Sequence, residues 1–199
     1  MSHAELPVVY LARHGETAWT LSGQHTGRTD LALTEHGELN ARALGERLKK
    51  LTFAKVWCSP LQRARKTCEL AGFADRCEID QDLLEWDYGK YEGITSADIR
   101  KTDPNWDLFT QGAPGGETPA QISARADRVV ARVRAIKGNV LLFSSGHILR
   151  VLAARWCGKE PTDMTRYLIL STASLSALSY EGNASRPGIK LWNDTTHVV

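Results

Sequence analysis

The chain has 199 residues, of which 42% are hydrophobic and 24% charged, values close to those of an ordinary globular domain. Its 25 lysines and arginines stand against 23 aspartates and glutamates, and the formal charge of +2 is too small to indicate a nucleic-acid or membrane-surface partner. The longest apolar runs fall far short of the about 18 to 20 residues that cross a bilayer, so we expect no transmembrane helix.

The start of the chain and its cysteines favour the cytoplasm. Residues 1–7 carry no basic segment ahead of an apolar core, so they do not look like a secretory leader. The cysteines are too sparse for a disulfide scaffold, and none is spaced as a C-x-x-C pair. We therefore expect a cytoplasmic protein with reduced thiols, and neither disulfides nor a zinc site, at Cys58, Cys68, Cys77 and Cys157.

In the first half of the chain, short apolar runs alternate with helical patterns. Residues 8–12 are rich in β-formers and end at a charged, glycine-containing segment, as a buried strand feeding a loop does. Thr34 can cap the helix that follows, and Pro60 suits the first turn of the next one. The predicted elements are a strand at 8–12, a loop at about 13–33, a helix carrying Leu44, Leu48 and Leu51, a strand at 56–59 and a helix over 61–71.

The second half contains the most distinct helix signal. Thr118, Pro119 and Gln121 form a capping box, and an apolar stripe at helical spacing extends from Ile122 to Ile136. Just before it, the sequence shows the least pattern, and the glycines there are expected to form a turn that enters this helix. The other predicted elements are a segment of uncertain type at 77–84, a strand at 140–144, a helix over 148–156 and closing strands at 174–180 and 189–192.

Strands that alternate with helices indicate an α/β fold. We expect a three-layer α/β/α sandwich over a mostly parallel sheet, with helices on both faces. The chain shows no repeat and no linker, so we expect one domain over residues 1–199, with a small cap segment at about 94–117. The ligand site of such a sheet lies at the carboxyl ends of its strands.

Two arginines and two histidines fall at these carboxyl ends. Arg13 and His14 follow the first strand, Arg63 follows the second, and His147 follows the strand at 140–144. Guanidinium groups pair bidentately with phosphate, and histidine serves as a nucleophile or acid-base group near neutral pH. Each residue alone also has a structural explanation, such as an exposed charge for Arg63 or a helix cap for His147. Together they indicate an anionic substrate, and phosphate is the simplest anion that fits.

Five short motifs surround these positions. They are Arg13-His14-Gly15-Glu16 with Gly23-Gln24-His25-Thr26-Gly27 after it, Ser59-Pro60-Leu61-Gln62-Arg63-Ala64, Leu84-Glu85 with Gly89, Gly116-Glu117-Thr118, and Ser145-Gly146-His147. In this order they resemble the motifs of the histidine phosphatase superfamily, the phosphoglycerate mutase-like proteins. The resemblance extends over nearly the whole chain and implies the phosphoglycerate mutase-like fold.

The resemblance implies a role for each of five catalytic residues. His14 would be the nucleophile that becomes a phosphohistidine, and it must be neutral to attack phosphorus. Arg13, Arg63 and His147 would bind the phosphoryl oxygens, with His147 as a cation. Glu85 would begin protonated, protonate the leaving oxygen, and then take a proton from the hydrolytic water.

Further residues receive expected roles. Glu16 is expected to support the loop and Arg150 to pair with a structural carboxylate. His25 and Arg28 are candidates for gripping a distal phosphate, with solvated loop residues as the alternative. The scheme implies no metal and no cofactor, because arginine and histidine neutralise the phosphate. The expected substrate-binding residues are Thr20, Gln24, Thr26, Gly27, Tyr88 and Ile148.

Phosphatase is the favoured function of three. The mutase branch carries an asparagine where this chain has Thr20, and a paired-arginine segment that is missing between residues 93 and 117. The chain instead resembles sugar-bisphosphate phosphatases such as sedoheptulose-bisphosphatase, and small bacterial acid phosphatases. We therefore expect hydrolysis of small phosphomonoesters, namely sugar phosphates or bisphosphates, by a possible homodimer with no nucleic-acid or membrane partner. The alternatives are a cofactor-dependent phosphoglycerate mutase and a catalytically silent phosphate-binding or scaffold protein.

Overall fold

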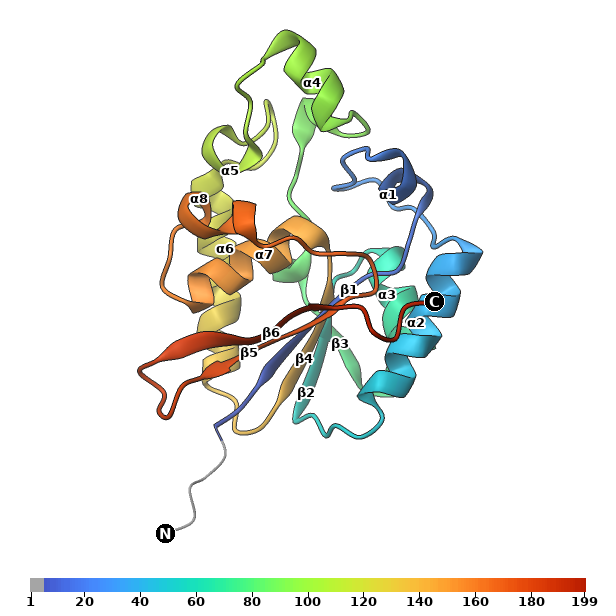
Figure 1. The fold of residues 1–199 in the computed structure, drawn as a ribbon, viewed down its shortest axis with the longest axis vertical. Coiled ribbons are helices and arrows are strands. Elements are labelled where there is room, and N and C mark those ends of the chain that lie inside the picture. Colours follow the sequence, from blue (N-terminus) through green and yellow to red (C-terminus); the bar gives the residue numbers. More distant parts are fainter. Residues whose placement is uncertain (1–5) are drawn as a thin grey trace.

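A computed structural model describes residues 6–199 and shows one six-stranded sheet (Figure 1). The strands are β1 (Val9–Arg13), β2 (Lys55–Cys58), β3 (Cys77–Ile79), β4 (Val140–Ser144), β5 (Leu175–Tyr180) and β6 (Pro187–Asp194). They lie in the order β3-β2-β4-β1-β5-β6, and the first four are parallel to one another. β5 runs antiparallel to both of its neighbours. The prediction of a mostly parallel sheet is confirmed.

Two pairs of helices cover opposite faces of the sheet (Figure 1). They are α2 (Glu35–Leu48) and α3 (Gln62–Leu70) on one face, and α6 (Pro119–Arg134) and α7 (Gly146–Trp156) on the other. Successive side chains of a strand point to opposite faces, so one apolar strand supplies both cores. In β4, Val140 and Leu142 pack with α6 and α7, whereas Leu141 and Phe143 pack with α2 and α3. The predicted three-layer sandwich is confirmed.

The helix starts show where the capping signals hold. Thr34 accepts a backbone N–H and starts α2, and Thr118 forms the predicted capping box with Gln121 at α6. Pro60 does not lie in the first turn of α3, because Leu61 is the N-cap and its carbonyl is the first to accept a helical hydrogen bond. The last predicted helix begins earlier than expected, at the start of α7, so that the Ser-Gly-His motif enters its first turn.

The segment at residues 94–117 contains two short helices beyond the carboxyl ends of the strands (Figure 1). They are α4 (Ser96–Thr102) and α5 (Leu108–Gln111). Ile99, Trp106 and Phe109 are buried in the same cluster as α6 and α7, and the indole Nε1 of Trp106 donates to the carbonyl of Gly112 at 2.9 Å. No helical period is detectable in this part of the sequence, because helices this short repeat an apolar position too few times.

Other short elements also lie outside the predicted ones. The expected loop after β1 contains α1 (Ala18–Ser22), which begins at a capping box between Thr17 and Thr20. The segment of uncertain type at 77–84 forms β3 and a 3-10 helix. The remaining elements are α8 (Pro161–Met164) and 3-10 helices at Ala74–Arg76, Gln81–Leu83, Gly89–Tyr91 and Thr165–Tyr167.

The expectation about a secretory leader rests on residues 1–7, of which 1–5 lie outside the described residues. Within residues 6–199, none of the helices has both the length and the apolar character that crossing a membrane requires.

Candidate active site

A pocket opens where the carboxyl ends of β1 and β4 meet. Its volume is about 200 Å³, less than the roughly 300–1,000 Å³ of sites for drug-sized ligands, so it suits a small substrate. Most of the predicted site residues line it: Arg13, His14, Thr20, Gln24, Thr26, Glu85, Tyr88 and His147.

His14 follows β1 and is only 3% exposed. Its N–H donates to the carbonyl of Ser144 at 2.9 Å, and its carbonyl accepts from the N–H of Ala173 at 3.0 Å, so the backbone is fixed on both sides. Its ring nitrogen Nδ1 lies 2.7 Å from the carbonyl oxygen of Gly15. A carbonyl oxygen only accepts, so Nδ1 carries the proton and the lone pair of Nε2 remains for an electrophile.

The turn after His14 is held by close backbone contacts. A Cβ atom at Gly15 would lie 2.5 Å from the carbonyl oxygen of Gly37, so only glycine fits there. The N–H of Gly15 donates to Oγ1 of Thr67 in α3 at 3.0 Å. Oε1 of Glu16 accepts from the hydroxyl of Thr34 at 2.7 Å and ties the same turn to α2. These contacts give Glu16 the supporting place expected for it.

Two guanidinium groups, from half-buried Arg13 and fully buried Arg63, lie beside His14. Arg13 donates through Nη1 to the carbonyl of Leu170, but the Nε–H groups of Arg13 and Arg63 are buried and find no protein acceptor among residues 6–199. Buried donors without a partner are uncommon, and they point to a bound anion. A Cβ at Gly146 would lie 3.3 Å from Nε of Arg13, so glycine at the start of α7 keeps the approach to this donor open.

Arg63 is absent from the residues that line the pocket, although its buried Nε–H lacks a protein acceptor among residues 6–199, so its expected role as a phosphate ligand stays a prediction. Its Nη1 donates to the carbonyl of Thr29 at 2.9 Å, and its Nη2 donates to those of Thr26 and Gly27 at 3.0 Å. These carbonyls already occupy its outer nitrogens. Burial, followed by the charges of Arg63 and Arg13, holds the pKa of His14 well below its ordinary value, so His14 is neutral near pH 7.

Glu85 is 3% exposed and follows the 3-10 helix at Gln81–Leu83. Its Oε1 accepts the N–H groups of Trp86 at 2.8 Å and Ile148 at 2.9 Å, and its Oε2 accepts the N–H of His147 at 2.9 Å. The carboxyl group therefore satisfies the first turn of α7, where the N-cap Ser145 makes no side-chain bond. Oε2 accepts a single N–H and so retains a lone pair that can hold a proton in the pocket.

Near pH 7 the ring of His147 is neutral in the free protein, and the cation that the resemblance implies for the phosphate-bound state stays a prediction. Burial, then the charges of Arg150 and Arg13, hold its pKa well below the ordinary value. The phenol oxygen of Tyr88 lies 2.6 Å from its Nδ1, and burial raises the pKa of Tyr88 well above 10, so the phenol keeps its proton. The phenol donates to Nδ1, which leaves the Nε2–H of His147 as a neutral donor.

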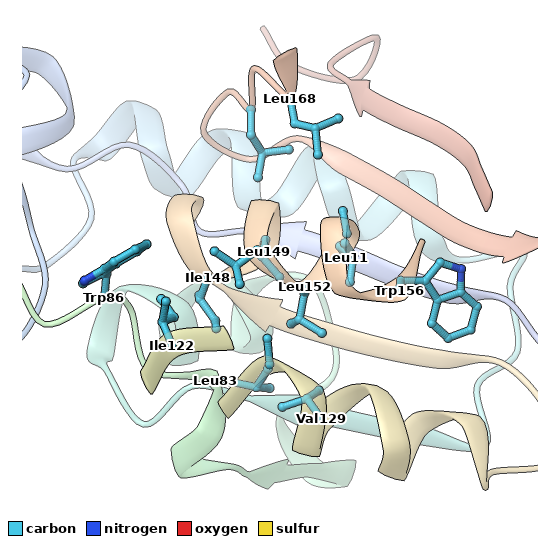
Figure 2. Close-up of a cluster of buried hydrophobic side chains, with 14 of the residues drawn as sticks. Leu11, Leu83, Trp86, Ile122, Val129, Ile148, Leu149, Leu152, Trp156 and Leu168 are labelled. Atoms are coloured by element: carbon cyan, nitrogen blue, oxygen red, sulfur yellow. The ribbon is translucent and has the colours of Figure 1, made fainter. Parts of the chain in front are cut away.

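Two expected substrate-binding residues do not reach the pocket. The side chain of Ile148 is fully buried in the cluster between α7 and α6, as Figure 2 shows, and its N–H is taken by Glu85. Gly27 donates its N–H to the carboxylate of Glu92 at 2.8 Å, and a Cβ there would lie 2.5 Å from the carbonyl oxygen of Trp86. Both residues therefore lie behind the residues that line the pocket.

Three expected polar residues line the pocket, but each also donates a hydrogen bond to a backbone carbonyl. The hydroxyl of Thr20 donates to the carbonyl of Thr17 at 2.8 Å, and Nε2 of Gln24 donates to the carbonyl of Gly93 at 2.7 Å. The hydroxyl of Thr26 donates to the carbonyl of Gln24 at 3.2 Å. Their donors therefore hold α1 and the neighbouring loop in place.

The pocket contains residues that sequence reasoning missed or misplaced. Arg150 lines it and donates to the carbonyl of Thr165 at 2.6 Å while stacking on a phenyl ring, instead of pairing with a carboxylate. Trp19 lines it from α1. Arg28 instead lies 3.5 Å from Asp87 on the surface, outside the pocket lining. The sequence offered one signal for Arg150, because this arginine stands three residues, about one helical turn, after His147.

His25 lines the pocket but is packed among aromatic rings. It is 9% exposed, its ring centroid lies 4.7 Å from that of Tyr88 and 5.4 Å from that of Trp106, and Nε2 lies 3.1 Å from the hydroxyl of Ser96. Burial lowers its pKa to about 4, against the ordinary value of 6.5. His25 is therefore a neutral wall residue, and not a cation for a distal phosphate, near pH 7.

This histidine makes stability depend on pH. The unfolded chain takes up the proton of His25 near pH 6.5 and the folded chain only near pH 4, so the free energy of unfolding falls as pH falls between these values. At about 1.4 kcal/mol per pH unit, we expect His25 alone to contribute a loss on the order of 3 kcal/mol, and His14 and His147 add to it in the same direction. Urea denaturation at pH 7 and pH 4.5 measures it. His25→Gln should show a smaller loss between the two pH values, and an unchanged loss would contradict the assignment.

Comparisons with known proteins agree with this geometry. The sequence pattern of the histidine phosphatase superfamily (branch 1) matches residues 9–195. The chain belongs to the histidine phosphatase superfamily. This histidine phosphatase is 39% identical over 175 residues to an acid phosphatase of Mycobacterium tuberculosis, and the match covers 86% of this chain and 85% of that protein.

Other relatives include both a phosphatase and phosphoglycerate mutases. Sedoheptulose 1,7-bisphosphatase of Saccharomyces cerevisiae is 34% identical over 184 residues, which are 76% of this chain and 68% of that protein. The solved structure of a functionally characterised open reading frame from Mycobacterium tuberculosis superimposes with a TM-score of 0.89 at 35% identity, over 94% of this chain and 97% of that one. Phosphoglycerate mutases match this histidine phosphatase less closely, at 31–32% identity. The expected family and fold are confirmed.

Proposed function

We propose that this histidine phosphatase hydrolyses phosphomonoesters of small metabolites, with sugar phosphates and bisphosphates as the substrate class, through a phosphohistidine at His14. The observation that carries the proposal is a neutral, buried imidazole whose Nδ1–H is committed to the carbonyl of Gly15. Beside it lies Arg13 with a buried Nε–H that lacks a protein acceptor. A nucleophile and an anion donor in one pocket fit phosphoryl transfer.

In the first step, Nε2 of His14 attacks phosphorus as the ester P–O bond breaks. Arg13 and the Nε2–H of His147 donate to the phosphoryl oxygens, where they stabilise charge through the transition state. Glu85, whose Oε2 has one backbone donor and lies in the pocket, transfers a proton to the leaving oxygen. The alcohol departs and a phosphohistidine remains.

In the second step, water attacks phosphorus and the P–N bond breaks. The carboxylate of Glu85 accepts the proton from that water, so the residue returns to its starting form. Nε2 of His14 regains its lone pair, and inorganic phosphate leaves. Arg13 supplies positive charge in both steps, and His147 adds a hydrogen-bond donor.

Three observations support small phosphorylated metabolites as the substrates. The pocket volume of about 200 Å³ accommodates a small molecule, and the packed segment with α4 and α5 lies beyond the strand ends. Trp19 and His25 offer rings against which an organic moiety can pack. The relatives named as an acid phosphatase and as sedoheptulose 1,7-bisphosphatase act on such esters.

We also infer that the protein acts in the cytoplasm, which the four free thiols support, since no disulfide joins the described residues.

A homodimer would bury exposed side chains such as Tyr167 and Ile169, which are 69% and 73% exposed. Light scattering on the purified protein measures whether one forms.

The test of function is phosphate release from a panel of sugar mono- and bisphosphates, beside 3-phosphoglycerate with and without 2,3-bisphosphoglycerate. A phosphatase releases inorganic phosphate and does not interconvert the phosphoglycerates. Rapid interconversion with little release would make the protein a mutase, and neither activity would make it a silent phosphate-binding protein.

Tyr88→Phe is expected to lower kcat about 10-fold, because one hydrogen bond that orients the ring of His147 is lost. Steady-state kinetics with melting temperatures measure the effect. Tyr91→Phe is the matched control. Tyr91 lies outside the pocket lining, so this variant should retain the activity of the parent protein. Equal activity in the two variants would show that the phenol of Tyr88 does not position His147.

A further inference from the structure

Three of the four cysteines meet at the contact of α3 with the edge of the sheet. Cys58 ends β2, Cys77 begins β3 and Cys68 lies in α3. Cys77 is paired with Val56, two residues before Cys58 on the neighbouring strand, so both thiols leave the same face of the sheet. The helix α3 covers this face, and the three Sγ atoms all lie within 4.8 Å of one another.

We propose that Cys58, Cys68 and Cys77 form a binding site for a thiophilic divalent cation of the zinc class, separate from the catalytic pocket. Three thiolates from two strands and one helix are a donor set that zinc takes, with the fourth position open. Tetrahedral zinc with Zn–S bonds of about 2.3 Å holds two sulfurs about 3.8 Å apart. Separations within 4.8 Å therefore need to contract by no more than about 1 Å.

An ion can reach these thiols from solvent. Cys58 and Cys68 are buried, but Cys77 is half-buried and lies with them in the wall of a cavity bounded also by Arg65 and Glu69. As three S–metal bonds form, three thiol protons pass to solvent, and the complex with a divalent ion carries one negative charge. The exposed guanidinium of Arg65, which lines the same cavity, offsets that charge, and the fourth position is left to water.

Metal binding would join β2, β3 and α3 by bonds additional to their apolar packing. Because the ion binds the folded arrangement, we expect it to raise the melting temperature of the protein. The site does not depend on the proposed phosphatase function, and its test uses no activity measurement. The chain spacing hid it, since the three cysteines lie on separate elements and no two form a short metal-binding motif.

The test is titration of the reduced full-length protein with Cd²⁺, followed by ultraviolet absorption, with Zn²⁺ added in competition. We expect a thiolate-to-metal charge-transfer band that saturates at one Cd²⁺ per chain and that Zn²⁺ removes. Zn²⁺ should also raise the melting temperature. No band at one equivalent, or a disulfide on mild oxidation without any metal band, would overturn the proposal.

Matched cysteine variants locate the site. Cys77→Ser changes the half-buried thiol, which the fold tolerates best, and should weaken Cd²⁺ binding at least about 10-fold. Cys68→Ala removes the buried thiol that α3 contributes, so the same Cd²⁺ titration tests whether the helix supplies a ligand. Cys157→Ser makes the same change as the first variant outside the cluster and should bind Cd²⁺ like the parent protein. Equal binding by Cys77→Ser, or equal loss in Cys157→Ser, would overturn the assignment.

Discussion

His14→Ala is expected to lose at least about 10⁴-fold of the phosphatase activity, because no other neutral imidazole in the pocket presents a free lone pair at the same place. Nδ1 of His147 accepts the phenol of Tyr88, and Nε2 of His25 faces Ser96. Phosphate release from the best substrate of the panel measures the loss. Rapid quenching in alkali, which preserves a phosphohistidine, followed by mass spectrometry should find a phosphoryl group on the parent protein and none on the variant.

His36→Ala provides the control, since this histidine is exposed and lies outside the pocket lining. It should retain most of the activity and still form the phosphohistidine. Activity that survives in His14→Ala would remove His14 as the nucleophile, and labelling at another histidine would name its replacement.

Glu85→Gln is expected to reduce hydrolysis of an alkyl phosphate by about 10²- to 10⁴-fold, the usual contribution of a proton-transfer group. An aryl ester such as 4-nitrophenyl phosphate needs little protonation of its leaving oxygen. With that ester we expect a burst of nitrophenol equal to the enzyme concentration, followed by slow turnover, because the second step still needs a base. Stopped-flow absorbance resolves the burst from the slow phase.

The amide also meets the start of α7 unfavourably. Its NH₂ group would face the N–H of either His147 or Ile148, where the carboxylate accepts both, and the unpaired donors cost on the order of 1–3 kcal/mol. Melting temperatures therefore accompany the kinetics, and Glu38→Gln, at an exposed carboxylate, serves as the control. A Glu85→Gln protein with an equal loss for alkyl and aryl esters and no burst would exclude the acid-base role.

Site residues at strand ends and helices marked by short-range spacing could be predicted well from the sequence. Arg13 and His14 follow β1, and Ser145 to His147 follow β4, so two motifs far apart in the chain reach the same edge of the sheet. Long helices with caps, such as the one that Thr118 begins, were predicted for the same local reason. These features need no knowledge of which side chains touch.

Direction and contact could not be predicted in the same way. Ile148 stands next to His147, yet a helix turns successive residues by about 100°, and its side chain points into the core. Arg63 has the expected place in the chain, but the carbonyls of residues 26–29 hold its outer nitrogens. The protonation of His147 depends on burial by segments that the sequence pattern did not resolve, α5 among them.

The short helix α1 has a consequence for how this enzyme can change over generations. None of its five residues is buried, and it is closed at both ends by its own caps, a threonine capping box and Gly23 with φ of 76°. Trp19 nevertheless forms part of the pocket wall. Selection can therefore exchange this wall for another without disturbing the folded core, while the chemistry on the sheet side remains fixed. New substrate preferences should arise from drift in this helix at almost no loss of thermal tolerance.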